Sequence, residues 1–240
     1  MARFFVTDEV SSQYVITGEN AAHIIRSLRM KIGEELVLCD TQSTDHVCKI
    51  SEIRGDSLLV DIISKSPCPN EASVKLKLFQ GLPKGDKIDT VVQKAVEMGV
   101  CEIYPCITSR CISRPDEKST HTKAVRLQKI AAEAACQSQR GIIPKVHNFL
   151  SFEKALKEFA DCELPMVFYE NGGEQIVDVL NKSYSEIAIF VGPEGGFEQK
   201  EIDEMIKHGA RVCTLGKRIL RTETASVAAS AVIMHLTKNL

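Results

Sequence analysis

Three glycine-containing segments in the second half of the chain each follow an apolar run, and they carry the residues best suited to chemistry. These segments are 169–173, 192–196 and 216–224. A strand that breaks into glycines before a helix is typical of a loop that cradles a ligand, because glycine allows a close backbone approach. The sequence therefore predicts one ligand site that three loops build together, and three ordinary glycine turns are the alternative.

The middle loop carries a carboxylate, Glu194, which argues against a phosphate ligand. Like unit charges about 4 Å apart repel by roughly 4 kcal/mol at an effective dielectric near 20. A helix N-terminus offers an anion only about 0.3–2 kcal/mol. The phosphate-binding patterns G-x-x-x-x-G-K-[ST] and G-x-G-x-x-G are also absent. If Glu194 faces the ligand, that ligand is neutral, cationic or rich in hydroxyls; the alternative is that Glu194 turns away from it.

The third loop carries a compact basic cluster, Lys217, Arg218 and Arg221, whose alternative role is ordinary charge beside a helix. The helix expected after it, 225–236, is rich in small residues and has no charged stripe. Such a helix is predicted to be buried all round, against the sheet or a second subunit. Thr222 and Thr224 are candidates for its N-cap.

The composition of the chain is that of an ordinary globular protein. No apolar run approaches the roughly 18 residues of a membrane span, and the first residues lack the apolar core of a signal peptide. The nine cysteines do not show the spacing of a zinc site, and we expect reduced thiols. These features predict a cytoplasmic protein with no membrane partner and no metal.

The charge is unevenly distributed, although the net charge is only −2. The region 74–145 is net positive, and the regions on both sides are net negative. A basic region is suited to a phosphate backbone, and scattered surface lysines are the alternative. The candidates in this region are Lys84, Lys87, Lys94, Arg110, Arg114, Arg126 and Arg140.

Two patterns of elements divide the chain. The first part is expected to hold short strands at 35–39, 46–50 and 57–63 and a helix at 20–28, as in a small β-barrel. Segment 64–70, with two prolines, is the expected linker. Strands and helices then alternate, which predicts an α/β fold with a mostly parallel sheet and ligands at the carboxyl ends of its strands. The expected strands are 74–79, 102–105, 166–169, 187–191 and 211–215, and the expected helices are 86–98, 120–140, 151–159, 174–180, 198–208 and 225–236.

Two of the loops also carry a family resemblance. The resemblance lies in segments 189–197 (IFVGPEGGF) and 215–225 (LGKRILRTETA), with shorter matches at 23–29, 93–100 and 109–111. In these segments the chain resembles the ribosomal RNA small subunit methyltransferase E family of the SPOUT class. The matches run through the whole chain in the family's order. One departure is Glu198, where the family usually has Ser or Thr as a helix N-cap.

The resemblance implies a fold and a reaction. It implies a PUA-like RNA-binding β-barrel at 1–68 and a trefoil-knotted α/β SPOUT methyltransferase domain at 72–240, in a homodimer. It implies S-adenosylmethionine as methyl donor and no metal. The implied reaction is methylation of N3 of a specific uridine in small-subunit (16S) ribosomal RNA within the assembled subunit.

Site residues follow from the same motifs. We expect Arg221 to stabilise negative charge on the uracil, with Glu223 as a candidate general base. The residues expected to hold the donor are Tyr169, Glu170, Val191, Gly192, Glu194, Gly195, Gly196, Leu215, Gly216, Ile219, Leu220 and Thr222. Those expected to bind RNA are Arg3, Arg26, Arg29, Lys84, Lys87, Lys94 and Arg110.

Two alternatives remain open at this point. One is a non-catalytic RNA-binding ribosome assembly factor that uses the same barrel and basic region. The other is a knotted methyltransferase that acts on transfer RNA. Donor binding distinguishes the first from an enzyme, and mapping of the methylated nucleotide distinguishes the second.

Overall fold

The computed structural model covers residues 1–240 and describes all of them apart from the side chain of Glu117. The chain divides into two compact units, one of Met1–Glu71 with Ala135–Ile143 and one of Ala72–Ala134 with Pro144–Leu240. The sequence boundaries, 1–68 and 72–240, did not foresee that 135–143 belongs with the first unit. In the described part of the chain, no helix is long and apolar enough to cross a membrane.

The first unit is built on a five-stranded sheet in the order β1-β3-β4-β5-β2. β1 pairs with β3 in parallel, and the other neighbours are antiparallel. The sequence analysis did not identify β1 and β2, and the expected helix at 20–28 is a short α-helix that continues as a π-helix. The elements are β1 (Ala2–Phe5), β2 (Gln13–Ile16), α1 (Gly18–Ala22), η1 (His23–Ser27), β3 (Glu35–Cys39), β4 (Thr44–Arg54) and β5 (Ser57–Pro67).

Alternating side chains of these strands form the core of the first unit. Leu36 and Leu38 of β3 and Val60 of β5 are fully buried, together with Ile24 of η1. The period of two places the apolar side chains on one face of the sheet. This unit therefore has a hydrophobic core of its own.

The predicted linker was wrong over its first half. Ser64–Pro67 continue β5 and pair with Val47–Thr44 of β4. Pro67 is the last residue of the strand. The proline therefore marks the end of the strand and not a flexible segment.

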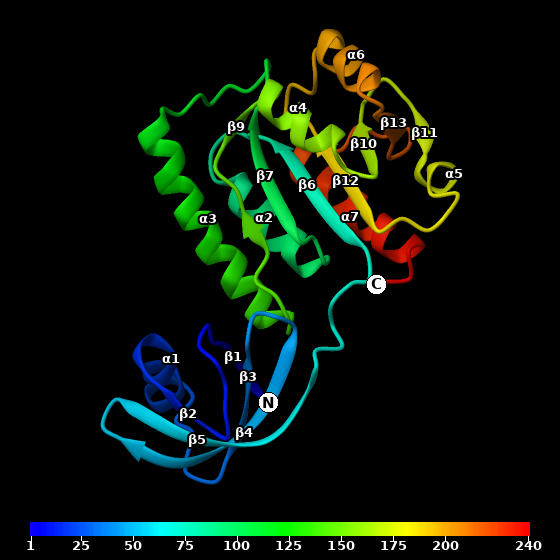
Figure 1. The fold of residues 1–240 in the computed structure, drawn as a ribbon. Helices are drawn as coiled ribbons and strands as arrows, with labels where there is room; N and C mark the ends of the chain where they lie inside the picture. Colours follow the sequence, from blue (N-terminus) through cyan, green and yellow to red (C-terminus); the bar gives the residue numbers. More distant parts are fainter. The chain divides into compact units, whose positions relative to one another are not determined.

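The second unit is an α/β structure, as the alternating pattern predicted. Its sheet has the order β11-β13-β10-β12-β6-β7-β8, with β9 beside β7, and every pair is parallel. Figure 1 shows its helices and strands. They are β6 (Lys75–Gly81), α2 (Lys87–Glu97), β7 (Glu102–Ile107), α3 (Glu117–Gln137), β8 (Lys145–Val146), β9 (Leu150–Ser151), α4 (Phe152–Ala160), β10 (Leu164–Phe168), β11 (Glu174–Gln175), α5 (Ile176–Val179), β12 (Glu186–Val191), α6 (Gln199–Lys207), β13 (Arg211–Thr214) and α7 (Thr222–Leu236).

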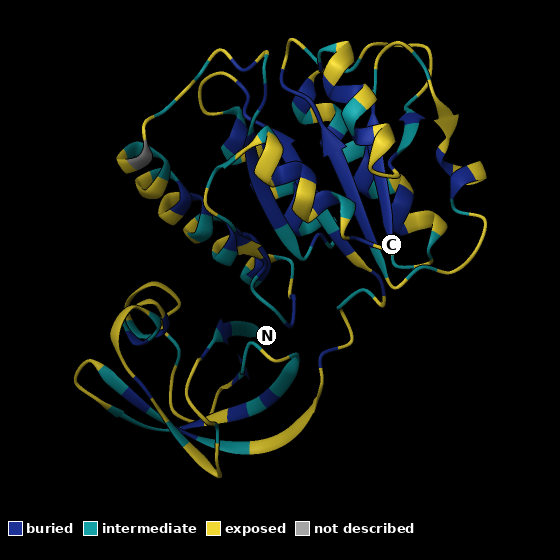
Figure 2. Cartoon of the chain, turned by 45° about the horizontal axis from the view of Figure 1, so that its top comes forward, coloured by how far each residue is buried: buried dark blue, intermediate teal, exposed yellow. Residues whose placement is uncertain are grey.

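Helices cover both faces of this sheet, which Figure 2 shows with strands in the buried colour. Phe79 of β6 and Phe190 of β12 pack with Phe159 of α4, and the same cluster includes Met205 of α6. α7 and α2 contact each other, and α7 also contacts β6 and β12. Because both faces are covered, the central strands are apolar throughout and not alternating.

The last helix, α7, is buried on one side within the single chain, and its predicted burial all round, against the sheet or a second subunit, stays a prediction. Ala229, Ser230 and Ile233 are buried, but Val232 and Leu236 are 39% and 38% exposed. The helix has few charges on any face, and its composition therefore did not distinguish the sheet-facing side from the outward one. Neither candidate threonine is its N-cap, because Arg221 takes that position without a side-chain cap bond.

Candidate active site

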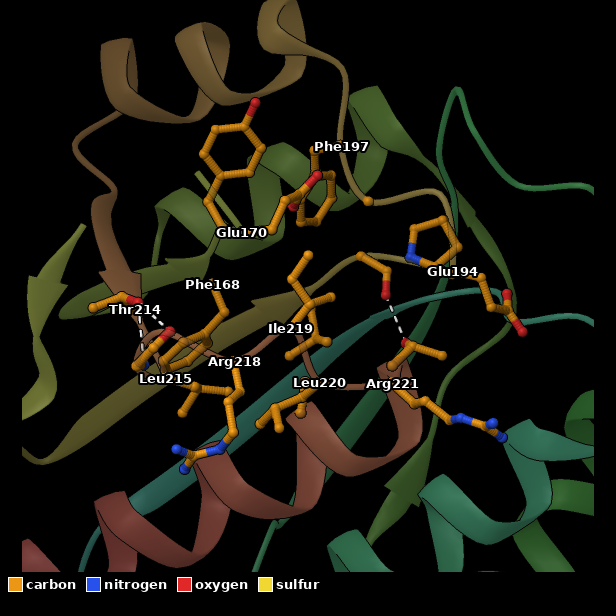
Figure 3. Close-up of a pocket in the computed structure, with 18 of the residues that line it drawn as sticks. Phe168, Glu170, Glu194, Phe197, Thr214, Leu215, Arg218, Ile219, Leu220 and Arg221 are labelled. Atoms are coloured by element: carbon orange, nitrogen blue, oxygen red, sulfur yellow. Dashed lines mark hydrogen bonds between the residues drawn. The ribbon is translucent and has the colours of Figure 1, made fainter. Parts of the chain in front are cut away.

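A cavity of about 360 Å³ opens at the carboxyl ends of β10, β12 and β13, where the sequence placed the ligand site. Figure 3 shows it with Ile219 and Leu220 at its centre and with Glu170 and Phe197 together on another wall. All three glycine-containing loops contribute to its lining. The residues that line it are Lys87, Phe168, Tyr169, Glu170, Val191, Gly192, Pro193, Glu194, Gly196, Phe197, Thr214, Leu215, Gly216, Lys217, Arg218, Ile219, Leu220, Arg221, Thr222 and Ala225.

Most of the residues expected at the donor site lie in this lining, and Arg221 lies there too. Gly195 and Glu223 do not belong to it. Glu223 instead has one carboxylate oxygen 3.8 Å from Nζ of Lys87.

The sequence analysis missed several lining residues. Pro193, Phe197 and Ala225 lie within the quoted segments but were not among the expected donor residues, and Phe168 and Thr214 directly precede two of the segments. Their only sequence signal is that proximity, because an apolar residue at a strand end is equally suited to the core. Lys87, which was expected to bind RNA, lines the cavity.

Glu194 lines the cavity and also braces its loop through hydrogen bonds to Lys84 and Lys87. Its carboxylate accepts hydrogen bonds from Nζ of Lys87 at 2.8 Å and from the backbone N–H of Lys84 at 3.2 Å. In Figure 3 the carboxylate is directed away from Ile219. Partial burial pushes the pKa of Glu194 upward, but the bonds from Lys87 and from backbone N–H groups outweigh it, and the pKa lies below its ordinary value.

Replacing Glu194 with glutamine is expected to lower the free energy of unfolding by about 0–1 kcal/mol at neutral pH, the usual range for a partly exposed ion pair. Because the pKa of Glu194 is lower in the folded chain than in the unfolded chain, its carboxylate contributes its full stabilisation of the fold at pH values above its unfolded-state pKa. That contribution is lost as the pH falls through the lower folded value. Urea unfolding of both proteins should show a difference that shrinks in acid. A difference that is constant with pH would contradict the brace.

Glu170 is the carboxylate that remains available to a ligand. It is exposed and has no ion pair or hydrogen bond with the described residues. Its side chain lies against Gly196, where an added Cβ would come within 2.4 Å of Oε1. The backbone of Gly196 has φ +65°, a conformation that glycine adopts without strain. Gly196 therefore leaves room for the carboxylate beside the cavity.

Gly81, at the end of β6, is a second glycine that allows two segments to pack closely, and the sequence analysis did not identify it. A Cβ on Gly81 would lie 2.6 Å from Cδ and 2.7 Å from the backbone nitrogen of Pro193. These atoms belong to a ring and a backbone, which have little freedom to move aside. Gly81 therefore lets the loop 192–196 pack directly on the end of β6.

Three exposed cations belong to the cavity lining. Lys217, Arg218 and Arg221 are exposed and form no ion pair with the residues that the structure describes. Figure 3 shows the guanidinium groups of Arg218 and Arg221 directed to opposite sides. Ile219 lies between them in the sequence and is 85% exposed. The loop therefore presents positive charge and an apolar side chain together.

Of the residues expected to bind RNA, some are accessible and some are engaged. Arg26, Arg29 and Lys84 are exposed. Lys94 pairs with Glu97 at 2.9 Å. Arg110 is exposed, and one of its N–H groups donates to the carbonyl of Gly195 at 2.8 Å, which leaves further donors of the guanidinium at the surface.

Arg3 does not suit the RNA-binding role that the sequence analysis gave it. Its side chain is 7% exposed and makes two hydrogen bonds of 2.7 Å to the carboxylate of Asp45. It also donates to the carbonyl of Arg140 at 2.8 Å. This bidentate pair occupies the guanidinium N–H donors that would otherwise bind a phosphate. Arg3 therefore holds the first unit together.

Two other candidates of the basic region are engaged in the same way. Arg140 is buried and donates to Glu71 at 2.8 Å. Arg126 donates to both carboxylate oxygens of Asp89, at 2.5 and 2.8 Å. Part of the positive charge of the region 74–145 is therefore neutralised locally.

The N-terminus of α6 is capped by a glutamate pair, Glu198 and Glu201, in place of the usual Ser or Thr. The side chain of Glu201 accepts the backbone N–H of Glu198 at 2.9 Å, the second half of a capping box. Its other oxygen accepts the backbone N–H of Ser109 at 2.9 Å, and Glu201 is only 2% exposed. This carboxylate fixes the helix that follows the loop 192–196.

Comparisons with known proteins agree with this architecture. A family model described as an RNA methyltransferase domain matches residues 70–234, and one described as an RNA methyltransferase PUA domain matches 16–63. The chain is 32% identical to the ribosomal RNA small subunit methyltransferase E of Bacillus subtilis, over 100% of this chain and 98% of that protein. It is 31% identical to the protein of the same name from Mesomycoplasma hyopneumoniae, over 95% of this chain and 96% of that one.

A solved structure is similar over nearly the whole chain. It is the crystal structure of a ribosomal RNA small subunit methyltransferase E from Neisseria gonorrhoeae bound to S-adenosyl methionine. The identity is 29%, the TM-score is 0.87, and the match covers 98% of each chain. The likeness therefore includes both units and the order of their elements.

Proposed function

The chain belongs to the ribosomal RNA small subunit methyltransferase E family, and from this premise we propose that it transfers a methyl group from S-adenosylmethionine to N3 of a uridine in small-subunit ribosomal RNA. The observation that carries this proposal is the cavity at the strand ends. It has a free carboxylate, Glu170, on one wall and the unpaired cations of 217–221 in its lining. A cationic donor and an anionic substrate require such an arrangement.

The cavity fits the donor in size and chemistry. Its volume of about 360 Å³ lies within the range of roughly 300–1,000 Å³ that is usual for small-molecule sites. The donor has a sulfonium cation, hydroxyls and an adenine, which suit a carboxylate, backbone groups and apolar side chains. We assign the donor to Tyr169, Glu170, Val191, Gly192, Gly196, Leu215, Gly216, Ile219, Leu220 and Thr222. Glu194 and Gly195 support the loop in this assignment.

Arg221 is the residue that we assign to catalysis. The donor supplies an electrophilic methyl group on a positively charged sulfur. Uridine N3 becomes nucleophilic as its weakly acidic proton leaves, and negative charge then develops on the uracil oxygens. An unpaired guanidinium in the cavity lining is suited to stabilise that charge. We assign Glu223 to holding Lys87, and its expected role as general base is not retained, because it lies outside the cavity lining.

The first unit is proposed to bind the ribosomal RNA, with Arg26 and Arg29 on its surface and Lys84 and Arg110 on the second unit. Replacing both Arg26 and Arg29 with alanine is expected to weaken RNA binding and to flatten its dependence on salt. Each lost phosphate contact lowers the slope of log K against log salt by roughly 0.7–0.9. Titrations at several salt concentrations measure this slope.

Arg54→Ala is the matched control for this pair. Arg54 is also exposed on the first unit, but it already pairs with Glu52. Its removal should leave the slope unchanged. Equal slopes for the wild type and for the double variant would remove Arg26 and Arg29 from the RNA-binding surface.

We propose a trefoil knot and a homodimer for the second unit. The knot is supported by the family and by the sheet order, in which β10 lies between β12 and β13 although it precedes both in the chain. The homodimer is supported by the outward face of α7, where Val232 and Leu236 are partly exposed. Light scattering of the purified chain measures the mass of the assembly, and a monomer would contradict the dimer.

Isothermal titration with S-adenosylmethionine tests the proposed function directly. The expected result is saturable binding of one donor per cavity. A chain that binds ribosomal RNA but no donor would be a non-catalytic assembly factor, and the proposed function would then be wrong.

A further inference from the structure

A group of buried, hydrogen-bonded polar side chains includes one residue of the cavity lining, Thr222, and two residues outside it, Gln80 and Ser226. Gln80, the penultimate residue of β6, is fully buried, and Thr222 and Ser226 of α7 are buried beside it. The elements that they belong to are far apart in the chain, since Gln80 and Thr222 are separated by 142 positions. Buried polar groups cost free energy unless they are hydrogen-bonded, so their bonds deserve a full account.

The amide of Gln80 has a partner on each side. Nε2 donates to the carbonyl of Gly81 at 2.8 Å and to Oγ1 of Thr222 at 2.9 Å. Oε1 accepts from the hydroxyl of Ser226. A carbonyl oxygen is only an acceptor, so the nitrogen of the amide must face Gly81. The same orientation directs an N–H at Thr222.

That orientation determines where the Thr222 hydroxyl proton points. Because Oγ1 accepts from Gln80, its own proton is free to donate elsewhere, and it donates to the carbonyl of Gly192 at 2.6 Å. Thr222 and Gly192 both line the cavity and belong to two of its three loops. Gln80 therefore connects, through Thr222, the loop that follows β12 with the segment that enters α7.

We propose that Gln80 is a positioning residue that sets the spacing of the two donor-binding loops and so controls the affinity for S-adenosylmethionine. It does so without touching the donor, because it is absent from the cavity lining. This inference rests on the proposed function. Its effect is specific to donor binding, since Arg221 and the RNA-facing cations make no bond to Gln80 in the described residues.

The test uses two substitutions and their combination. Gln80→Glu keeps the shape but loses the donating side of the amide, so the Thr222 proton is drawn toward the new carboxylate and away from Gly192. Thr222→Val removes the hydroxyl at nearly constant volume. Each is expected to weaken S-adenosylmethionine binding about tenfold or more in isothermal titration, because a buried partner is left unsatisfied. The kcat at saturating donor should fall much less than the affinity.

Ser230→Ala is the matched control. Ser230 is a fully buried residue of the same helix, and its hydroxyl donates only to the carbonyl of Ser226 at 2.8 Å. Its donor affinity should equal that of the wild type. Thermal melts of all variants distinguish lost stability from lost positioning.

The double variant supplies the decisive comparison. If both residues act through one bridge, their losses of donor affinity should not add up. The double variant Gln80→Glu/Thr222→Val should then bind the donor as tightly as whichever single variant has the lower affinity. Losses that multiply, or donor affinities that equal the wild type despite lower melting temperatures, would overturn the inference. If Gln80→Glu does not fold, Ser226→Ala takes its place, because it removes the hydroxyl that donates to Oε1 of Gln80 and lies outside the cavity lining; it should weaken donor binding where Ser230→Ala does not. A wild type that does not bind the donor contradicts the proposed function instead.

Discussion

Replacing Arg221 with alanine is expected to lower kcat by about a hundredfold or more, the usual cost of removing one group that stabilises charge in a transition state. The donor affinity should remain close to the wild-type value, because the proposed partner of Arg221 is the uracil. The fold should also be unaffected. Arg221 is the N-cap of α7, but only its backbone carbonyl takes part, accepting from Ala225 at 2.8 Å.

Two further variants make the Arg221 result specific. Arg221→Lys keeps the charge and loses the planar fork, so it should recover only part of the activity. Lys182→Ala removes one exposed positive charge outside the cavity lining and should leave kcat unchanged. Single-turnover methylation with saturating donor measures all three. Wild-type kcat in Arg221→Ala, with unchanged donor binding, would remove Arg221 from catalysis.

Replacing Gly81 with alanine is the second change with a large expected effect. The added Cβ would lie 2.6 Å from the ring of Pro193 and 2.7 Å from its backbone nitrogen. Overpacking of this kind costs about 1–3 kcal/mol, and relief requires the loop 192–196 to move away from β6. We expect donor affinity to fall about tenfold to a hundredfold, together with a lower melting temperature.

Gly209→Ala separates loop displacement from general destabilisation. Gly209 follows α6 with φ +88° and has open space around its Cβ position. Alanine there is strained by about 1–2 kcal/mol but meets no atom of the cavity. It should lower the melting temperature without changing donor affinity. If Gly81→Ala binds the donor as the wild type does, loop packing on β6 does not control the site.

The elements of the second unit were predictable because their burial leaves a clear pattern. The central strands are covered on both faces, so β12 is a continuous apolar run that ends in glycines. The helices between them have the helical period and clear end signals, such as Ser151 before α4. The three ligand loops followed from the same rule, since the carboxyl ends of parallel strands meet at one edge.

The parts that could not be predicted depend on partners far away in the chain. Arg3 has the same sequence character as any surface arginine, and its pairing with Asp45, 42 positions away, is a property of the folded sheet. Arg140 and Glu71 are 69 positions apart. Local charge therefore suggested RNA contacts that the fold uses for ion pairs.

Gln80 illustrates the same limit at the candidate site. In the sequence it is the polar end of an apolar strand, where a turn or an exposed residue is the ordinary expectation. Its bonds to Thr222 and Ser226 exist only because β6, β12 and α7 meet below the cavity. The carboxylate of Glu194 is similar, because its partners Lys84 and Lys87, in the loop before α2 and at the start of that helix, are more than a hundred positions away.

The most direct measurement of the central claim is the identity of the methylated nucleoside. Small ribosomal subunits and free small-subunit RNA from a strain without this gene would be incubated with the purified chain and labelled S-adenosylmethionine. The RNA would then be digested, and the nucleosides would be identified by mass spectrometry. We predict 3-methyluridine at a single position of small-subunit ribosomal RNA, with assembled subunits as the better substrate. Label in another nucleoside, label in transfer RNA alone, or no label in any RNA would contradict the proposed function.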